Sequence, residues 1–196
     1  MSEQATASGK KRGSALIVGG GIGGMQAALD LADSGFKVHL VQKESSIGGI
    51  MSSLDKTFPT GDCAMCMISP KMVDVGRHLN IEIHSCSELV ALEGEAGDFT
   101  ATVKKHARYV DLNKCTGCES CVKACPVESP SEYDQGLARR TAISRRYAQA
   151  VPGAVAIDKQ GTSPCRVDCP AEVNAHAYVI LTARGRYAEA LERLGK

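Results

Sequence analysis

The sequence has no tryptophan and only three phenylalanines among 196 residues, so large aromatic side chains do not dominate its core. No apolar run approaches the roughly 20 residues that a membrane-spanning helix needs. The formal net charge of +1 gives no indication of nucleic-acid binding. Residues 1–13 are polar, lack the apolar stretch of a signal peptide, and are expected to form a disordered tail. These absences argue against a membrane, secreted or nucleic-acid-binding protein.

Nine cysteines are the most informative residues of the chain. Without a secretion signal they argue against a disulfide framework and favour metal binding in a reducing cytoplasm. Four of them have the spacing C-x2-C-x2-C-x3-C followed by proline, at Cys115, Cys118, Cys121, Cys125 and Pro126. This spacing is typical of 4Fe–4S ligands, in which three cysteines hold one cluster and the cysteine before proline binds elsewhere. A zinc site is the alternative, although zinc usually takes two cysteine pairs with a longer spacer.

A glycine-rich turn near the N-terminus predicts a nucleotide site. Residues 14–18 read as a strand, 25–34 as a helix that ends at Gly35, and 37–41 as a second strand. The turn before the helix has the pattern G-x-G-x-x-G, at Gly19, Gly21 and Gly24, with Gly23 inside it. Such glycines allow a tight turn, close approach of the backbone to a pyrophosphate at the helix N-terminus, and close packing of helix on strand. A glycine-rich turn without a nucleotide is the alternative.

The residues after the second strand bear on which nucleotide binds. An acid is expected there to bind ribose hydroxyls, but the sequence has Gln42, followed by Lys43 and Glu44. Gln42 can still hydrogen-bond a hydroxyl, although it supplies no carboxylate. The pair Gly48–Gly49 follows, and in flavoproteins a second glycine pair at this place makes room for the FAD pyrophosphate. We therefore expect FAD rather than NAD, with an ordinary turn as the alternative.

The rest of the chain predicts short elements joined by long connections. The expected elements are loops over 45–70, a short helix over 71–78, strands over 81–84, 88–92 and 100–105, a basic helix over 138–149, and two final helices over 172–182 and 187–194. Four arginines recur on one face of the basic helix, at Arg139, Arg140, Arg145 and Arg146. They can meet an acidic partner or flavin phosphates. A solvated face, or attraction to the five acids of residues 111–135, is the simpler interpretation.

Together these motifs resemble the A-type subunit of heterodisulfide reductase, from about Ser14 to Lys159. The stretches that carry the resemblance are the glycine turn, Ile47–Gly49, Leu54–Thr60, Asp62–Cys66, Pro70–Val73, Tyr109–Asp111 and the cysteine run. Members of that family hold FAD in a thioredoxin-reductase-like domain with an inserted ferredoxin module, and they pass electrons between flavin and clusters. The resemblance implies an α/β fold with a partial FAD-binding Rossmann domain, a ferredoxin-like 4Fe–4S module and a short helical tail.

From about Pro164 the chain resembles the N-terminal iron–sulfur region of dihydropyrimidine dehydrogenase and of the glutamate synthase small subunit. A C-x3-C-P motif supplies cluster ligands there, which implies that role for Cys165 and Cys169. The cysteine pair that normally stands just upstream is missing from 156–163. Either Cys169 completes the first cluster, or Cys125 completes it and the later two cysteines serve another site. One cluster is therefore expected, and a second stays open.

Cys63 and Cys66 form a C-x2-C pair within the stretch that carries the family resemblance. They are candidate catalytic residues as a redox dithiol. Supplying the missing cluster ligands, or serving as small buried hydrophobes, are the alternatives. Cys86 lies in an expected strand and is interpreted as structural. None of the five histidines is assigned to a metal.

Four segments are expected: a tail over 1–13, an FAD-binding Rossmann-like part over 14–110, a ferredoxin-like iron–sulfur module over 111–170, and a helical segment over 171–196 that begins a truncated domain. An FAD domain of this type needs later strands to complete its sheet. The chain is therefore expected to be a fragment of a longer protein or a split subunit.

The predicted function is electron transfer between FAD and 4Fe–4S clusters, in an oxidoreductase complex that acts on a sulfur group or disulfide. Expected partners are other subunits of that complex, a ferredoxin, or a hydrogenase- or dehydrogenase-type donor, with no nucleic acid and no membrane span. One alternative is a non-enzymatic electron-transfer adapter whose catalytic flavin lies in a partner or in a missing C-terminal part. A zinc-stabilised interaction module with a vestigial nucleotide loop is the other.

Overall fold

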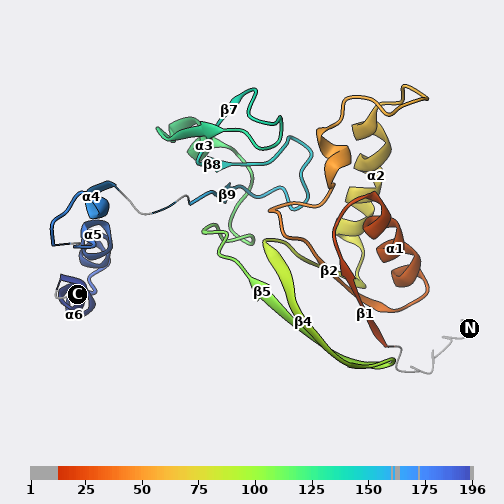
Figure 1. The fold of residues 1–196 in the computed structure, drawn as a ribbon, viewed down its shortest axis with the longest axis horizontal. Coiled ribbons are helices and arrows are strands. Elements are labelled where there is room, and N and C mark those ends of the chain that lie inside the picture. The colour runs from red at the N-terminus through yellow and green to blue at the C-terminus, as the bar shows by residue number, and fades with distance from the viewer. Residues whose placement is uncertain (1–12, 160, 162–163, 172, 195–196) are drawn as a thin grey trace, which may run out of the picture. The chain divides into compact units, whose positions relative to one another are not determined.

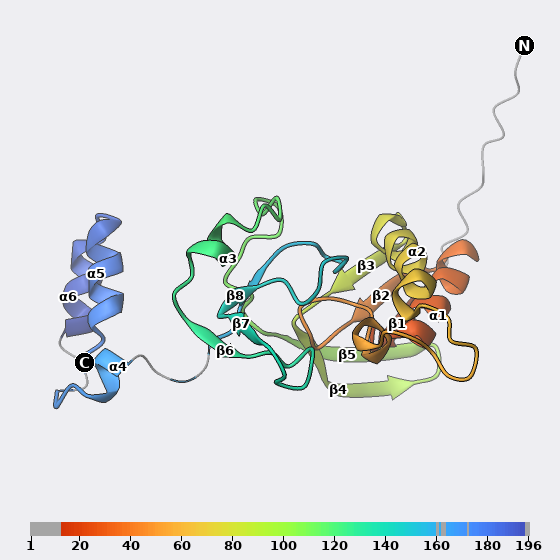
Figure 2. The same cartoon turned by 90° about the horizontal axis from the view of Figure 1, so that it is seen from above.

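The computed structural model describes residues 13–159, 161, 164–171 and 173–194 (Figures 1 and 2). The chain divides into two compact units, Met1–Asp158 and Lys159–Lys196, which are described separately. The tail expected over 1–13 lies outside the described residues except for Gly13. The division into four segments remains a prediction.

A three-stranded parallel sheet forms the centre of the first unit. Its strands are β1 (Ser14–Val18), β2 (Lys37–Val41) and β3 (Ile81–His84), in the order β1-β2-β3. All three coincide with the predicted strands. Because side chains alternate between the faces of a strand, Val38 and Leu40 of β2 point together into the core and are fully buried.

Two helices cover that buried face, as Figure 1 shows. They are α1 (Ile22–Asp33) and α2 (Ala64–Arg77). The main core consists of small and aliphatic side chains with one tyrosine, namely Met25, Ala28, Ala32, Val38, Leu40, Ile47, Ile68, Met72, Val75, Ile81, Tyr147 and Ala150. The prediction that the core does not depend on large aromatic side chains is confirmed.

The stretch predicted as loops over 45–70 is more ordered than its sequence indicates. A 3-10 helix, η1 (Ile50–Ser53), precedes α2, and α2 begins at Ala64 instead of Lys71. Pro70 lies inside α2, where proline removes one backbone donor. The helix persists because one side of it is buried, at Ala64, Ile68, Met72 and Val75. Similarly, α1 begins three residues before the predicted start, directly after Gly21.

An antiparallel hairpin lies on the other side of the sheet from the helices (Figure 1). It consists of β4 (Ser87–Glu95) and β5 (Asp98–Lys105), joined at Ala96 and Gly97. Both strands are longer than predicted. Gly97 has a φ of +99°, a left-handed conformation that glycine adopts at low cost.

The cysteine-rich part contains one short helix and two small hairpins. The elements are α3 (Ser120–Ala124), β6 (Glu128–Pro130) paired with β7 (Arg139–Thr141), and β8 (Ile143–Ser144) paired with β9 (Ala156–Ile157). The basic helix predicted over 138–149 is wrong, because its first half pairs in these ladders. The β-branched Thr141 and Ile143 suit strands better than a helix.

The arginines expected on that helix pair with acids instead of facing solvent together. Arg139 Nε lies 3.1 Å from Glu128 Oε2, and Arg140 Nη2 lies 2.8 Å from Asp158 Oδ2. Arg145 pairs with Glu119. Attraction between this segment and the preceding acids is therefore confirmed for Glu119 and Glu128.

Tyr147 fixes the cysteine-rich part to the nucleotide-type fold within the first unit. Its hydroxyl donates to the Ile47 carbonyl, and the backbone N–H of Ile47 donates to the Val151 carbonyl at 2.9 Å. Burial raises the pKa of the Tyr147 hydroxyl, which therefore stays protonated as a donor. The return from β8 to β9 thus belongs to the main core.

The second unit contains three helices among its described residues. They are α4 (Pro164–Val167), α5 (Ala175–Ala183) and α6 (Tyr187–Leu194), and α5 packs against α6. The final helix has its predicted bounds, whereas α5 begins at Ala175 and α4 was not predicted. In the described parts of the chain, no helix is both long and apolar enough to cross a membrane.

Gly48 provides a test of this packing. It has a φ of +124°, and an added Cβ would lie 2.4 Å from Tyr147 Oη. Gly97 has a similar positive φ, but nothing lies within 4 Å of its added Cβ. Gly97→Ala should cost about 1–2 kcal/mol of unfolding free energy from backbone strain. Gly48→Ala should cost about 1–3 kcal/mol more from the clash, measured by urea unfolding followed by far-UV circular dichroism. Equal costs for the two variants would contradict the described packing.

Candidate functional site

The glycine turn between β1 and α1 has the geometry of a phosphate-binding turn. Gly19 has a φ of +103°, and a Cβ added to Gly24 would lie 1.9 Å from the Gly19 carbonyl oxygen. Only glycine therefore fits at Gly24. By contrast, a Cβ added to Gly19, Gly21 or Gly23 would meet nothing within 4 Å. The turn is tightly packed on its inner side and open where a ligand would approach.

The N-terminus of α1 opens onto the same space. Gly21 is its N-cap, and no side chain of the described chain caps the helix there. The first N–H groups of a helix have no partner within the helix, and together with the helix dipole they favour a bound anion. The open turn and the uncapped donors fit the pyrophosphate of a dinucleotide.

The second glycine pair lies directly against the first turn. The backbone N–H of Gly48 donates to the Gly20 carbonyl at 2.7 Å. A Cβ added to Gly49 would lie 3.0 Å from the Gly21 Cα, so any larger residue at position 49 would press on the turn. The structure therefore brings all six predicted glycines to one place: Gly19, Gly21, Gly23, Gly24, Gly48 and Gly49.

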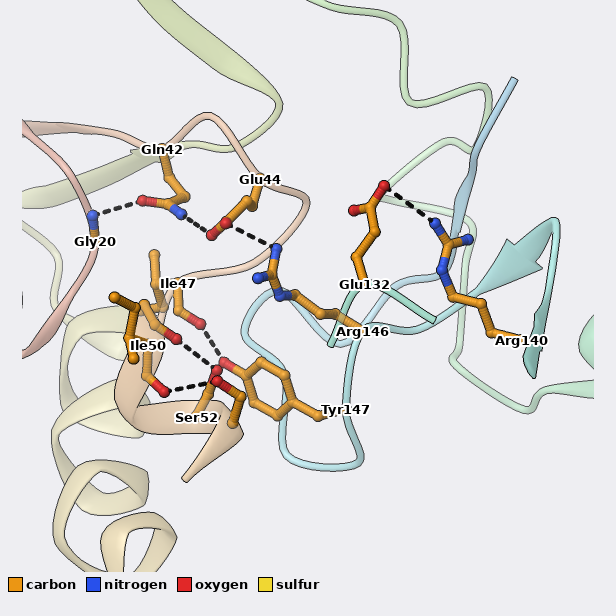
Figure 3. Close-up of polar contacts among 12 residues, drawn as sticks. Gly20, Gln42, Glu44, Ile47, Ile50, Ser52, Glu132, Arg140, Arg146 and Tyr147 are labelled. Carbon is orange, nitrogen blue, oxygen red and sulfur yellow. Dashed lines mark hydrogen bonds and ion pairs between the residues drawn. The ribbon is translucent and has the colours of Figure 1, made fainter. Parts of the chain in front are cut away.

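Gln42 supports the turn from beneath (Figure 3). Its Oε1 accepts from the Gly20 N–H at 2.6 Å, and its Nε2 donates to Glu44 Oε2 at 2.5 Å. Gln42 is buried, and both ends of its amide are occupied by these bonds. The ribose-binding role considered for Gln42 therefore passes more naturally to the Glu44 carboxylate, which is about 39% exposed.

Glu44 reaches a cavity that the nucleotide-type fold and the cysteine-rich part line together. The cavity has a volume of about 540 Å³. Glu44 Oε1 pairs with Arg146 Nη1 at 3.0 Å, as Figure 3 shows. Its charged lining residues carry both signs, and they are Lys43, Glu44, Glu132, Arg140, Arg146 and Asp158. Of the predicted residues, Lys43 and Glu44 face this cavity, while the glycines form the neighbouring turn.

Arg108 is a structural residue of this region that the sequence did not reveal. Its guanidinium donates to the Ser45 carbonyl at 2.7 Å, to Ser85 Oγ at 3.2 Å and to the Val155 carbonyl at 3.1 Å. Burial lowers the pKa of Arg108 from its high ordinary value, and the group remains charged at neutral pH. One side chain thus joins the ends of β2 and β3 to the segment that leads into β9.

The four cysteines of the run lie at or near the surface. Cys118 and Cys121 are exposed, and Cys115 and Cys125 are half-buried. Hydrogen bonding to the backbone of Ser120 is the main cause of the lowered pKa of Cys118, and bonding to the backbone of Ile143 lowers the pKa of Cys125. Lowered values favour the thiolate form that iron binds. This donor set fits a 4Fe–4S cluster.

The cysteine sulfurs are not drawn together as they would be around a single ion. In the described part of the chain, no three cysteine sulfurs lie within 4.8 Å of one another. A cluster has several irons and spreads its cysteine ligands more widely than one zinc ion does. Cys165 and Cys169 belong to the second unit, and their role as ligands stays a prediction.

Cys63 and Cys66 lie at the N-terminus of α2, and both are exposed. Cys63 is the N-cap, and its sulfur accepts from the Cys66 backbone N–H at 3.2 Å. Hydrogen bonding from the Cys66 thiol, and then from that N–H, lowers the pKa of Cys63, while the same thiol contact raises the pKa of Cys66. The exposure excludes the alternative that these cysteines are buried hydrophobes. Their catalytic role stays a prediction.

Comparison with known proteins agrees with both motifs. Residues 15–66 match the family model described as FAD dependent oxidoreductase, which indicates FAD. Residues 108–131 match the 4Fe-4S binding domain, which indicates a 4Fe–4S cluster. A solved thioredoxin reductase from T. acidophilum aligns over 50% of this chain and 34% of its own, with 21% identity and a TM-score of 0.41.

Three archaeal relatives, all A-type iron–sulfur subunits of heterodisulfide reductases, are similar over most of this chain. The second CoB–CoM heterodisulfide reductase form of Methanopyrus kandleri is 54% identical over 73% of this chain and 22% of its own length. The H(2):CoB-CoM heterodisulfide,ferredoxin reductase form of Methanothermobacter marburgensis is 50% identical over 77% and 23%. The form from Methanocaldococcus jannaschii is 53% identical over 78% and 23%. The chain thus spans less than a quarter of the length of these relatives.

Two glycine variants separate binding from folding at the turn. Gly21→Ala should weaken FAD binding at least about tenfold, because the methyl group enters the space reserved for the pyrophosphate. Gly23→Ala should change FAD affinity by less than about threefold, since alanine keeps the N–H and favours a helix. Titration of flavin fluorescence measures both affinities. The assignment fails if the two variants bind FAD equally well.

The cysteine pair predicts an order of reactivity. Below pH 8, Cys63 should be alkylated by iodoacetamide faster than Cys66, because its lower pKa leaves more thiolate. Cys66→Ala removes the main donor to Cys63, and should shift the pH midpoint of Cys63 alkylation upward. Cys66→Ser keeps a donor and is the matched control. Peptide mass spectrometry follows each site, and faster reaction of Cys66 in the unmodified protein would refute the geometry.

Proposed function

Over 73–78% of its length the chain is homologous to the A-type subunit of heterodisulfide reductase, and we propose from this premise that it passes electrons between FAD and a 4Fe–4S cluster. The observation that supports the proposal most directly is that both motifs share one compact unit. Ile47 bonds to Val151, and Tyr147 bonds back to Ile47, so the cysteine-rich part is anchored beside the glycine turn.

The residues divide the binding task between them. The turn at Gly19–Gly24 and the N-terminus of α1 bind the pyrophosphate, Gly48 and Gly49 leave room for it, and Glu44 binds the ribose. Cys115, Cys118 and Cys121 hold the cluster, with Cys125 or a later cysteine as the fourth ligand. When bound, FAD supplies exchange between two-electron and one-electron steps, and the cluster accepts single electrons.

Cys63 and Cys66 are proposed as a redox dithiol for the same system. Oxidation of the pair to a disulfide releases two electrons and two protons, the number that one flavin accepts. The contact between the two sulfurs supports the pairing, and the lowered pKa of Cys63 supports its role as the attacking thiolate.

We further propose that the chain works within a larger complex in a reducing cytoplasm. The named relatives are subunits of heterodisulfide reductases, and one is also named for ferredoxin. A ferredoxin, or a hydrogenase- or dehydrogenase-type donor, is the expected electron partner, and a disulfide is the expected substrate of the whole enzyme.

A second candidate is an adapter that carries only the cluster. The engagement of Gln42 by Gly20 and Glu44 favours it, because the place of the usual ribose-binding acid has become a structural tether. In that case the catalytic flavin would lie in a partner or in a C-terminal part outside this chain.

Anaerobic reconstitution with iron, sulfide and FAD tests the proposal. We expect about four irons per chain together with bound FAD, and light-driven reduction of the flavin should be followed by the electron paramagnetic resonance signal of a reduced cluster. Cys118→Ser should lose the iron and keep FAD, whereas Cys86→Ser, the control outside the run, should keep both. Iron without flavin would support the adapter, and zinc without visible absorption would overturn both candidates.

A further inference from the structure

A cluster of two histidines and one glutamate lies on the sheet, away from the candidate sites described above. His39 is in β2, and Glu82 and His84 are in β3. The parallel register sets His39 opposite Glu82. His84 is two residues along β3 and so projects from the same face as Glu82. This is the face opposite the one on which Val38 and Leu40 contact the helices.

The potential ligand atoms of these three side chains converge. His39 Nδ1 lies 3.1 Å from His84 Nε2. Glu82 Oε2 lies 3.7 Å from His39 Nδ1, and Glu82 Oε1 lies 3.8 Å from His84 Nε2. All three ligand atoms lie within 4.8 Å of one another, the one group of this kind among the described residues.

These separations suit a tetrahedral metal ion. Zinc binds imidazole nitrogen and carboxylate oxygen at about 2.0–2.2 Å, so two ligands at a tetrahedral angle lie roughly 3.3–3.5 Å apart. The observed 3.1, 3.7 and 3.8 Å surround that range, and a small rotation of the Glu82 side chain brings them closer to it. Adjacent strands hold the side chains, and rigid elements preorganise a site better than loops do.

The environment also suits a metal ion. The exposed fractions of the side chains are 36% for His39, 51% for Glu82 and 30% for His84, which leaves access for an ion and a water ligand. Burial is the main cause of the lowered pKa of His84, which favours the neutral imidazole that metals bind. Lys37 Nζ lies 3.5 Å from Glu82 Oε2, but this amine is itself half-exposed and can turn to solvent.

An adjoining cavity of about 910 Å³ gives the cluster an open side. His39, Val41 and His84 line it from the sheet, and Leu89, Leu92, Phe99 and Val103 line it from the β4–β5 hairpin. The fourth position of a tetrahedral ion therefore points towards a largely apolar space, which is large enough for a water or a small ligand.

We propose that His39, Glu82 and His84 form a binding site for a divalent transition-metal ion of the zinc class, which crosslinks β2 to β3. Two imidazoles and one carboxylate with an open fourth position are a ligand set that zinc accepts, and cobalt can replace zinc as a visible probe. The site is independent of the cluster cysteines and of the proposed electron transfer. A plain hydrogen bond between the imidazoles, with Glu82 nearby, is the alternative.

Titration of Co²⁺ into the protein with its iron–sulfur cluster in place tests the proposal. We expect one Co²⁺ per chain with weak ligand-field bands, and without the intense thiolate charge-transfer bands that binding at Cys63 and Cys66 would give. His39→Ala and His84→Ala should each weaken binding at least about tenfold. His106→Ala is the matched control, because His106 Nε2 also contacts a carboxylate, that of Glu88, at 2.8 Å but has no second imidazole.

Zinc should also raise the melting temperature of the protein. At zinc concentrations near 100 times the dissociation constant, the expected rise is roughly 5–10 °C for a chain of this size. The rise should be lost in His84→Ala and kept in His106→Ala, with all three proteins melting within a few degrees of one another when metal is absent. Absence of Co²⁺ binding, binding unchanged in His39→Ala and His84→Ala, or binding with thiolate bands alone would overturn the proposal.

Discussion

The contact on which most of this structure depends is the close approach of two glycine turns. Gly48 bonds to Gly20, Gly49 lies against Gly21, and Tyr147 closes the stack from the other side. No Cβ fits at Gly24, and one at Gly48 would meet Tyr147. This packing leaves the outer side of the first turn open beside an uncapped helix, so a stable interior and a ligand-accepting surface result from the same constraint.

Buried polar side chains then join parts of the chain that are distant in sequence. Gln42 joins the glycine turn to Glu44, Glu44 reaches Arg146, and Arg108 bonds to Ser45 and Val155. Buried polar groups are costly unless they are paired, so these bonds select one arrangement of the cysteine-rich part against the sheet. For an electron carrier, a fixed arrangement matters because transfer depends on a constant distance between its two centres.

The thiols follow a similar logic of local donors. Cys63 is stabilised as a thiolate by the start of α2, and Cys118 and Cys125 by nearby backbone groups. Each of these cysteines lies where backbone N–H groups are not all used in a helix or a ladder, and each is accessible. The opposite face of the sheet carries a different ligand chemistry, with imidazoles and a carboxylate held in register by β2 and β3.

The sequence by itself determined the features that depend on neighbours in the chain: the strands 14–18, 37–41 and 81–84, the glycine turn, and the C-x2-C-x2-C-x3-C run. It failed where tertiary packing outweighs local preference, since burial carries α2 through Pro70 and strand pairing replaces the helix expected over 138–149. The roles of Arg108, Arg146 and Tyr147 depend on partners some 46 to 102 positions away, and their local sequence has no periodicity that marks them. The three-residue cluster of His39, Glu82 and His84 was likewise created by strand register, because only the folded sheet brings residue 39 beside residues 82 and 84.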